Sequence, residues 1–234
     1  MIDPEQKTSI IAIDGPAAAG KSTTARLLAR RLGFVLLDSG ALYRCVALHL
    51  IRRNIPPDAQ WIPEDALSCL KISVEPGVSS MKIFLKGEDV NALLRDESIG
   101  EAASRFSALP EVRKALLGLQ RSTGSRWNLV AEGRDMGTVV FPYAQFKFFL
   151  IADVDERARR RYLEIVGRGS RANFQQVRSQ MVERDRRDEL RTASPLVMAA
   201  DAVAIDATAL RPEEVVERMM RVIEERAEAP NSAE

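Results

Sequence analysis

Short runs of consecutive hydrophobic residues recur along the chain, with longer stretches of helical spacing between them. Strand-length runs cover residues 9–14, 34–38, 128–132, 146–151 and 202–206. Strands that are hydrophobic at nearly every position are buried on both faces, which is typical of a parallel sheet. The pattern therefore predicts an α/β fold with a five-stranded parallel sheet and helices on both faces.

This alternation breaks between the second and third runs. Residues 71–90 contain short strand-like segments around turn-forming pairs at 76–77 and 79–80. Helical patterns follow over 91–107 and 110–120. We predict that this part of the chain forms a small, β-containing lobe inserted into the parallel core.

A further pair of helices, over 154–166 and 174–190, carries an unusual charge pattern. The chain has 27 Arg to 7 Lys at a net charge of +1, and 156–191 alone contains eleven Arg and no Lys. The fixed fork of arginine matches two phosphate oxygens at once. This segment has three interpretations: a phosphate-binding surface, a solvated helix face with many ion pairs, or an RNA-binding stripe.

Residues 15–22 read GPAAAGKS and fit the pattern G-x-x-x-x-G-K-[ST]. The match follows a predicted strand and opens a predicted helix over 21–31, which is the context that such a phosphate loop requires. We expect Lys21 to reach the β- and γ-phosphates of ATP and the Ser22 hydroxyl to bind Mg²⁺. The predicted ATP-binding residues of the loop are Gly15, Pro16, Ala17, Ala18, Ala19, Gly20, Lys21, Ser22 and Thr23.

Polar residues follow the second strand in the sequence DSGALYR. On a helix that starts near Ser39, Tyr43 and Arg44 lie one turn further on, where they suit the base and phosphate of an acceptor nucleotide. The alternative is that Asp38 or Ser39 only caps the helix.

The third strand ends in EGRDMGT, at the edge of the sheet where ligands bind in such folds. An acid here suits a metal shell, and Arg134 suits a phosphate. The alternative is a tight polar turn with an internal ion pair.

The remaining composition excludes several classes of function. His49 is the only histidine, so neither a histidine metal site nor a histidine triad is expected. No run approaches the roughly 20 apolar residues of a membrane helix, and Cys45 and Cys69 are expected to be buried free thiols. We expect a cytoplasmic protein. Transfer to a phosphate needs no general base, which favours a phosphate acceptor over a hydroxyl acceptor.

Together the segments GPAAAGKST, LLDSGALYR, KGEDV, EGRDMGTVVFP and ERDRRDELR resemble the bacterial cytidylate kinases, in order over about residues 10–208. The resemblance implies a P-loop kinase that uses ATP and Mg²⁺ to phosphorylate CMP or dCMP. It implies a single domain over 1–234 with a nucleotide-monophosphate-binding lobe and an Arg-rich lid. The expected boundaries are 8–53, 125–153 and 192–227 for the core, 54–124 for the lobe, and 154–191 for the lid.

The same resemblance assigns site residues. The implied acceptor site comprises Asp38, Ser39, Tyr43, Arg44, Ser104, Arg113, Arg134, Asp135, Arg184, Asp188 and Arg191. Arg113 and Asp135 would read the cytosine edge, while Arg157, Arg160 and Arg161 would reach ATP from the lid. The implied catalytic residues are Lys21, Arg134, Arg160 and Arg191. One departure is Glu132, where the family often has Asp, and this changes the geometry of any metal-shell role.

Two other functions remain open at this stage. One is a P-loop kinase of another small acceptor, such as a different nucleoside monophosphate, shikimate or a sugar acid. The other is a nucleotide-gated RNA-binding protein, which the near-neutral net charge disfavours. We expect no nucleic-acid partner and no membrane partner, and nothing in the sequence demands more than a monomer.

Overall fold

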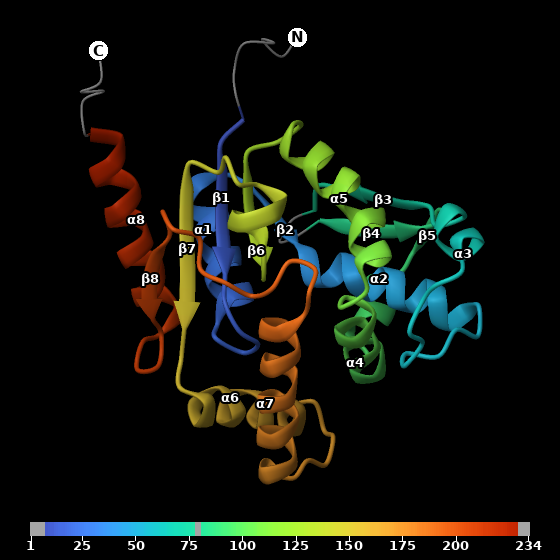
Figure 1. Cartoon of the computed structure of the whole chain (residues 1–234). Helices are drawn as coiled ribbons and strands as arrows, with labels where there is room; N and C mark the ends of the chain where they lie inside the picture. The colour runs from blue at the N-terminus through green and yellow to red at the C-terminus, as the bar shows by residue number, and fades with distance from the viewer. Residues whose placement is uncertain (1–7, 78–80, 229–234) are drawn as a thin grey trace.

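All five strands of the core sheet run parallel in the computed structural model, which describes residues 8–77 and 81–228 (Figure 1). The strands are β1 (Ile10–Asp14), β2 (Val35–Asp38), β6 (Leu129–Gly133), β7 (Phe146–Ile151) and β8 (Val203–Asp206). Their order across the sheet is β2-β6-β1-β7-β8. The predicted fold class is therefore confirmed, with strand ends that differ by one residue at most.

Both faces of this sheet are covered by helices, as the hydrophobic runs predicted. Ile11 and Ile13 of β1 pack with α1 (Lys21–Leu32) and α8 (Pro212–Glu228) on one face. On the other face, the alternate residues of β1 pack in a cluster with α2 (Ser39–Arg52), α4 (Glu97–Phe106) and α5 (Pro110–Gly124). Burial on both sides explains why the strands are hydrophobic at consecutive positions.

The insertion forms a second, antiparallel sheet beside α2 (Figure 1). It contains α3 (Glu64–Ser68), β3 (Ile72–Glu75), β4 (Lys82–Leu85) and β5 (Glu88–Asp89). The short strands are therefore confirmed, while the turn expected at 79–80 lies outside the described residues.

The single helix predicted over 91–107 is wrong in one respect. It is divided into a 3₁₀ turn, η1 (Leu93–Arg95), and helix α4. The division occurs because Asp96 has extended backbone angles and its carboxylate accepts a hydrogen bond from the backbone N–H of Ser98 at 2.8 Å. This is the geometry of a helix N-cap, which starts a new helix.

Helices α6 (Val154–Gly167) and α7 (Phe174–Leu190) lie beyond the carboxyl ends of the core strands (Figure 1). They pack together through Ala158, Val177 and Met181. Ala17 and Ala18 of the phosphate loop pack against the same cluster. The Arg-rich helix pair is thus in contact with the loop that follows β1.

The two cysteines are free thiols, as expected. Cys45 is buried in α2, but Cys69 is only partly buried, because it follows the short helix α3 at the edge of the inserted lobe. In the described part of the chain, no helix combines the length and hydrophobicity that crossing a membrane requires.

Candidate functional site

The loop between β1 and α1 follows a sharply curled backbone path. Gly15, Ala18 and Gly20 have φ angles of 145°, 55° and 97°, which side chains of L-residues rarely tolerate. A Cβ on Gly15 would lie 2.1 Å from the carbonyl oxygen of Leu150, so only glycine fits where the chain leaves β1. Ala18 adopts the left-handed conformation without being glycine, at a cost of about 1–3 kcal/mol. Such strain is typical of binding loops.

Helix α1 begins directly after this curl with uncapped backbone N–H groups. Gly20 occupies the N-cap position, and no side chain among the described residues caps the first turn. Free N–H groups and the positive end of the helix dipole attract anions. The Nζ atom of Lys21 donates to the carbonyl oxygen of Pro16 at 2.6 Å. Burial, and then the charge of Arg134, lowers the pKa of Lys21, so an anion bound here would stabilise its charged form.

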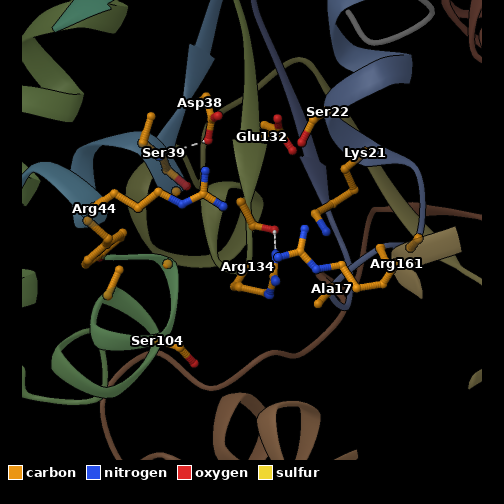
Figure 2. A pocket seen from close by; sticks show the side chains of 18 of the residues that line it. Ala17, Lys21, Ser22, Asp38, Ser39, Arg44, Ser104, Glu132, Arg134 and Arg161 are labelled. Atoms are coloured by element: carbon orange, nitrogen blue, oxygen red, sulfur yellow. Dashed lines mark hydrogen bonds between the residues drawn. The ribbon is translucent and has the colours of Figure 1, made fainter. Parts of the chain in front are cut away.

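The loop opens into a cavity of about 1260 Å³, which also reaches the inserted lobe and the helices α6 and α7. Figure 2 shows labelled side chains from the phosphate loop, α2, α4, β6 and α6 around it. The predicted residues that line it are Ala17, Ala18, Ala19, Gly20, Lys21, Ser22, Thr23, Asp38, Ser39, Tyr43, Arg44, Ser104, Arg113, Arg134, Asp135, Arg160, Arg161, Arg184, Asp188 and Arg191. Gly15 and Pro16 form the back of the loop and do not line the cavity.

Arg157 also lies outside the cavity wall. Its Nη1 atom donates to Asp185 at 2.6 Å and to the carbonyl oxygen of Ala17 at 3.2 Å, while its Nε atom donates to the carbonyl oxygen of Ala152 at 2.9 Å. The side chain is buried, and these contacts tie α6 to α7 and to the phosphate loop. We therefore interpret Arg157 as a structural clamp rather than the phosphate ligand expected from the sequence.

At the end of β2, Asp38 caps helix α2, which was the alternative considered for it. Its carboxylate accepts a hydrogen bond from the backbone N–H of Ala41 at 3.0 Å. Ser39 follows and is buried. Tyr43 lies one turn after Ser39 on α2. Its ring centre is 5.2 Å from the guanidinium of Arg113, a cation–π contact. Burial raises the pKa of Tyr43 to about 12, so its phenol stays protonated at neutral pH.

The turn after β6 directs two charged side chains to different walls of the cavity. Arg134 donates from Nε to Asp188 on α7 at 2.8 Å. Asp135 accepts a hydrogen bond from Arg113 on α5, and both members of this ion pair are buried. Arg134 and Asp135 thus bind partners on other elements, and the alternative prediction of an ion pair within this turn is wrong. A buried ion pair costs desolvation, so its presence is weak evidence for a role in stability.

Arg160 and Arg161 leave α6 in different directions. Arg160 donates from Nη2 to the carbonyl oxygens of Ala207 at 2.7 Å and Thr208 at 3.0 Å, in the segment after β8. Arg161 pairs with Glu97 at the start of α4. Helix α6 is thus connected to both the core and the inserted lobe.

The end of α7 brings together Arg184, Asp188 and Arg191, as the family resemblance implied. Arg191 lies 3.7 Å from the carboxylate of Asp188. Burial lowers the pKa of Arg184 to about 10, and its Nε atom has no hydrogen-bond partner within the described structure. Because buried polar atoms are almost always paired, an unpartnered guanidinium donor in a cavity wall marks a place for an anion.

Glu132 and Ser22 lie side by side at the sheet edge (Figure 2). Glu132 is buried, and its Oε1 atom lacks a partner among the described residues. Burial, and then the neighbouring Asp38, raises the pKa of Glu132. A hydroxyl and a carboxylate fit Mg²⁺, which prefers oxygen ligands and keeps several waters. No group of three or more His, Cys, Asp or Glu in the described ranges would hold a metal ion alone, so further ligands would have to come from bound phosphates.

Some cavity residues were missed by sequence reasoning. Arg187 lines the cavity with a buried Nε atom that has no partner in the described part of the chain, and its place three residues after Arg184 on α7 was an available signal. Ala207, Leu210 and Pro212 line the wall after β8. These three gave no signal, because small and apolar side chains carry no recognisable chemistry.

The parallel sheet, the phosphate loop and the Arg-rich helices facing one cavity define the chain as a P-loop kinase, an ATP-dependent phosphotransferase. The family model for cytidylate kinase matches residues 11–225. The chain belongs to the cytidylate kinase family.

Individual relatives agree with this assignment. The chain is 46% identical to the cytidylate kinase of Geobacter sp. (strain M21) over 217 residues, which cover 93% of each chain. It is 44% identical to the cytidylate kinase of Carboxydothermus hydrogenoformans, with 91% of this chain and 96% of that one covered. The crystal structure of an uncharacterized protein from Eubacterium ventriosum has a TM-score of 0.51 at 14% identity, covering 94% of this chain and 100% of that chain. That last similarity shows the fold alone.

Proposed function

We propose that the chain transfers the γ-phosphoryl group of ATP to CMP or dCMP, which gives ADP and CDP or dCDP. The observation that carries the proposal is one cavity shared by the phosphate loop and by a second polar pocket around Tyr43, Arg113 and Asp135. The donor loop alone fits many nucleotide-binding proteins, whereas the second pocket supplies a place for an acceptor. Relatives at 44–46% identity that are named cytidylate kinases narrow that acceptor to a cytidine nucleotide.

The donor would lie on the phosphate loop, with the uncapped N–H groups of α1 and the ammonium of Lys21 around its β- and γ-phosphates. Arg160 and Arg161 would approach the transferring group from α6, since both already line the cavity. Arg161 has to leave Glu97 to do so. Positive charge placed around the phosphoryl group stabilises the charge that spreads over its oxygens in the transition state.

The acceptor would bind with its base beside the Arg113–Asp135 pair. That pair offers a donor and an acceptor of hydrogen bonds at the ring of Tyr43, which suits the edge and face of a cytosine. Ser104, whose buried hydroxyl has no partner among the described residues, adds a further polar contact.

The acceptor's phosphate would meet the guanidinium groups around the end of α7. We assign this contact to Arg44, Arg134, Arg184 and Arg191, and the contact with ribose hydroxyls to Asp188. A phosphate oxygen is already ionised at neutral pH, so the chain needs to align and neutralise it rather than deprotonate it.

Mg²⁺ would bind at the Ser22 hydroxyl and near the Glu132 carboxylate, together with phosphate oxygens of the donor. When bound, the ion would neutralise charge on the β- and γ-phosphates. The buried carboxylate of Glu132, with one oxygen unpartnered in the described structure, supports this placement. Exchange of Glu132 for Gln should raise the Mg²⁺ concentration needed for half-maximal rate, and an unchanged requirement would remove Glu132 from the metal shell.

We also propose the division of the chain that the sequence predicted: a core, an acceptor lobe over 54–124 and a lid over 154–191. Cytoplasmic location, a monomeric state and the absence of nucleic-acid or membrane partners stay predictions from the sequence.

The test is a coupled ADP-release assay with ATP, Mg²⁺ and a panel of acceptors: CMP, dCMP, UMP, AMP, GMP, shikimate and gluconate. Turnover mainly with CMP and dCMP supports the proposal. Turnover with another acceptor would keep the chain a P-loop kinase and replace only its substrate. The absence of turnover with every nucleotide in the panel would contradict the proposed function.

A further inference from the structure

The carboxylate of Asp14 caps a helical turn that lies far away in the sequence. Its Oδ1 atom accepts a hydrogen bond from the backbone N–H of Met136 at 2.8 Å, and its Oδ2 atom accepts one from Gly137 at 2.7 Å. These two residues begin the π-helical turn η2 (Met136–Val140), which follows the charged turn after β6. Asp14 itself is the last residue of β1, directly before the phosphate loop.

A helical turn is ordinarily capped by the residue that precedes it. Here that residue is Asp135, a good capping residue by type, yet its side chain makes no capping hydrogen bond. Its carboxylate instead accepts from Arg113 in the acceptor pocket. Asp14 accepts from the first two backbone N–H groups of the turn, including that of Gly137, which a local cap could otherwise accept.

We propose that Asp14 is a positioning residue: by capping η2 it keeps the side chain of Asp135 directed at Arg113 and links the donor loop to the acceptor turn. This inference rests on the proposed function, because it assigns the Arg113–Asp135 pair to the acceptor base. Asp14 does not line the cavity, so it acts through Asp135 rather than by touching a substrate.

The burial of Asp14 supports this interpretation. The side chain is 5% exposed, and burial raises its pKa to about 6. At neutral pH the carboxylate is thus ionised at a cost in stability, and within the described residues the two backbone N–H groups are its only hydrogen-bond donors. A buried charge that costs stability is more often found where function requires it.

The test compares Asp14→Asn, Asp135→Ala and the double variant by initial rates. An Asn amide accepts one of the two N–H groups but turns its own NH₂ group toward the other, so the cap is broken with little change in size. Asp14→Asn should raise the KM for CMP about tenfold and leave the KM for ATP within about twofold. In the Asp135→Ala background the same exchange should add little, because both act through one side chain.

Asp206→Asn is the matched control. Asp206 also ends a strand of the core sheet and accepts a backbone hydrogen bond, from Thr208 at 2.8 Å, but it lies away from η2. It should leave the KM for CMP unchanged. An equal rise in both KM values for Asp14→Asn, or an effect that adds fully to that of Asp135→Ala, overturns the inference.

A crystal structure of the Asp14→Asn variant gives a readout that needs no assay. The inference expects Asp135 to leave Arg113 and to turn back to cap η2, where its carboxylate can accept from the backbone N–H of Gly137 or Thr138. If Asp135 still pairs with Arg113, the inference fails even if the chain phosphorylates CMP. If the wild-type chain does not phosphorylate CMP, but Asp135 leaves Arg113 in the variant, the proposed function fails and the positioning role of Asp14 stands. Asp14→Ser, which is smaller and keeps one acceptor, replaces Asp14→Asn should that variant not fold.

Discussion

Arg161 on α6 and Glu97 on α4 form an ion pair that links the proposed lid to the proposed acceptor lobe. Both side chains line the shared cavity, so this pair occupies an arginine that the donor phosphates would need. Glu97 is 57% exposed. Arg161 is 26% exposed and also pairs with Glu164 at 2.6 Å. Because Glu97 is open to solvent, the pair contributes about 1 kcal/mol, which is little enough for a phosphate to displace the carboxylate.

Exchange of Glu97 for Gln should therefore strengthen ATP binding. Arg161 no longer has to leave this carboxylate, and the KM for ATP should fall about two- to fivefold at low ionic strength, with a smaller change at high salt. Glu101→Gln is the control, since Glu101 pairs with Arg105 on the same helix at 3.0 Å and its loss removes the same charge. A rise in the KM for ATP with Glu97→Gln would show that the pair assists closure rather than competing with it.

The core and the phosphate loop were predictable from the sequence because both depend on local pattern. The five strands of the core sheet, of which β1 and β6 are buried at every position, produced near-continuous hydrophobic runs, and the residues of the loop stand next to one another in the chain. Local pattern placed Tyr43, Arg44 and Arg134 near an acceptor, but only the family resemblance predicted that residues of α4, α5 and α7 would join them. Arg113 and Asp135 meet from elements that local pattern does not bring together.

What the sequence did not predict depends on long-range contacts or on where a side chain is buried. The family resemblance grouped Arg157 with Arg160 and Arg161 as a ligand of ATP, but the side chain of Arg157 is held by Asp185 on α7. The cap from Asp14 to Met136 joins positions 122 residues apart. Neither contact leaves a periodic signal in the chain.

The exchange of Lys21 for Ala should abolish transfer without unfolding the chain. The ammonium group is buried and its pKa is lowered by that burial, so its removal relieves a desolvation cost while it removes the charge at the β- and γ-phosphates. Turnover should fall by at least about 10²-fold, and the melting temperature should change little. Lys114→Ala, at an exposed position of α5, should leave both quantities unchanged. An active Lys21→Ala enzyme would contradict the assignment of the phosphate loop.

The exchange of Arg134 for Lys should reduce turnover far more than stability. Arg134 donates from Nε to Asp188 at 2.8 Å and from Nη1 to the carbonyl oxygen of Gly133 at 3.2 Å. Lysine keeps the charge but lacks the planar fork that binds a carboxylate and a phosphate together. The expected loss is about 10²-fold in kcat.

Arg178→Lys provides the comparison for that variant, since Arg178 forms an exposed pair with Asp155. It should keep its turnover. An Arg134→Lys variant that lost stability but retained kcat would place Arg134 in the structure of the turn instead of on a phosphate.

The raised pKa of Asp14 predicts how stability depends on pH. The ordinary pKa of 3.8 rises to about 6 in the folded chain, because burial favours the protonated carboxyl more than Met136, Gly137 and Lys21 favour the charged one. The folded state therefore binds this proton more tightly than the unfolded state does. The stability that this group contributes is fully present below about pH 4 and is lost as the pH rises through about 6.

Asp14→Asn cannot titrate, so the free energy of unfolding of the wild type minus that of the variant should fall as the pH rises from about 4 to about 8, by up to about 3 kcal/mol. Urea denaturation across that range measures the difference directly. Glu132, whose pKa is also raised, and the neighbouring Asp135 and Lys147 are present in both proteins and largely cancel. A difference that stays constant with pH would mean that Asp14 keeps an ordinary pKa. Its carboxylate would then cap η2 at no cost in stability. The further inference would lose the support that it takes from this cost.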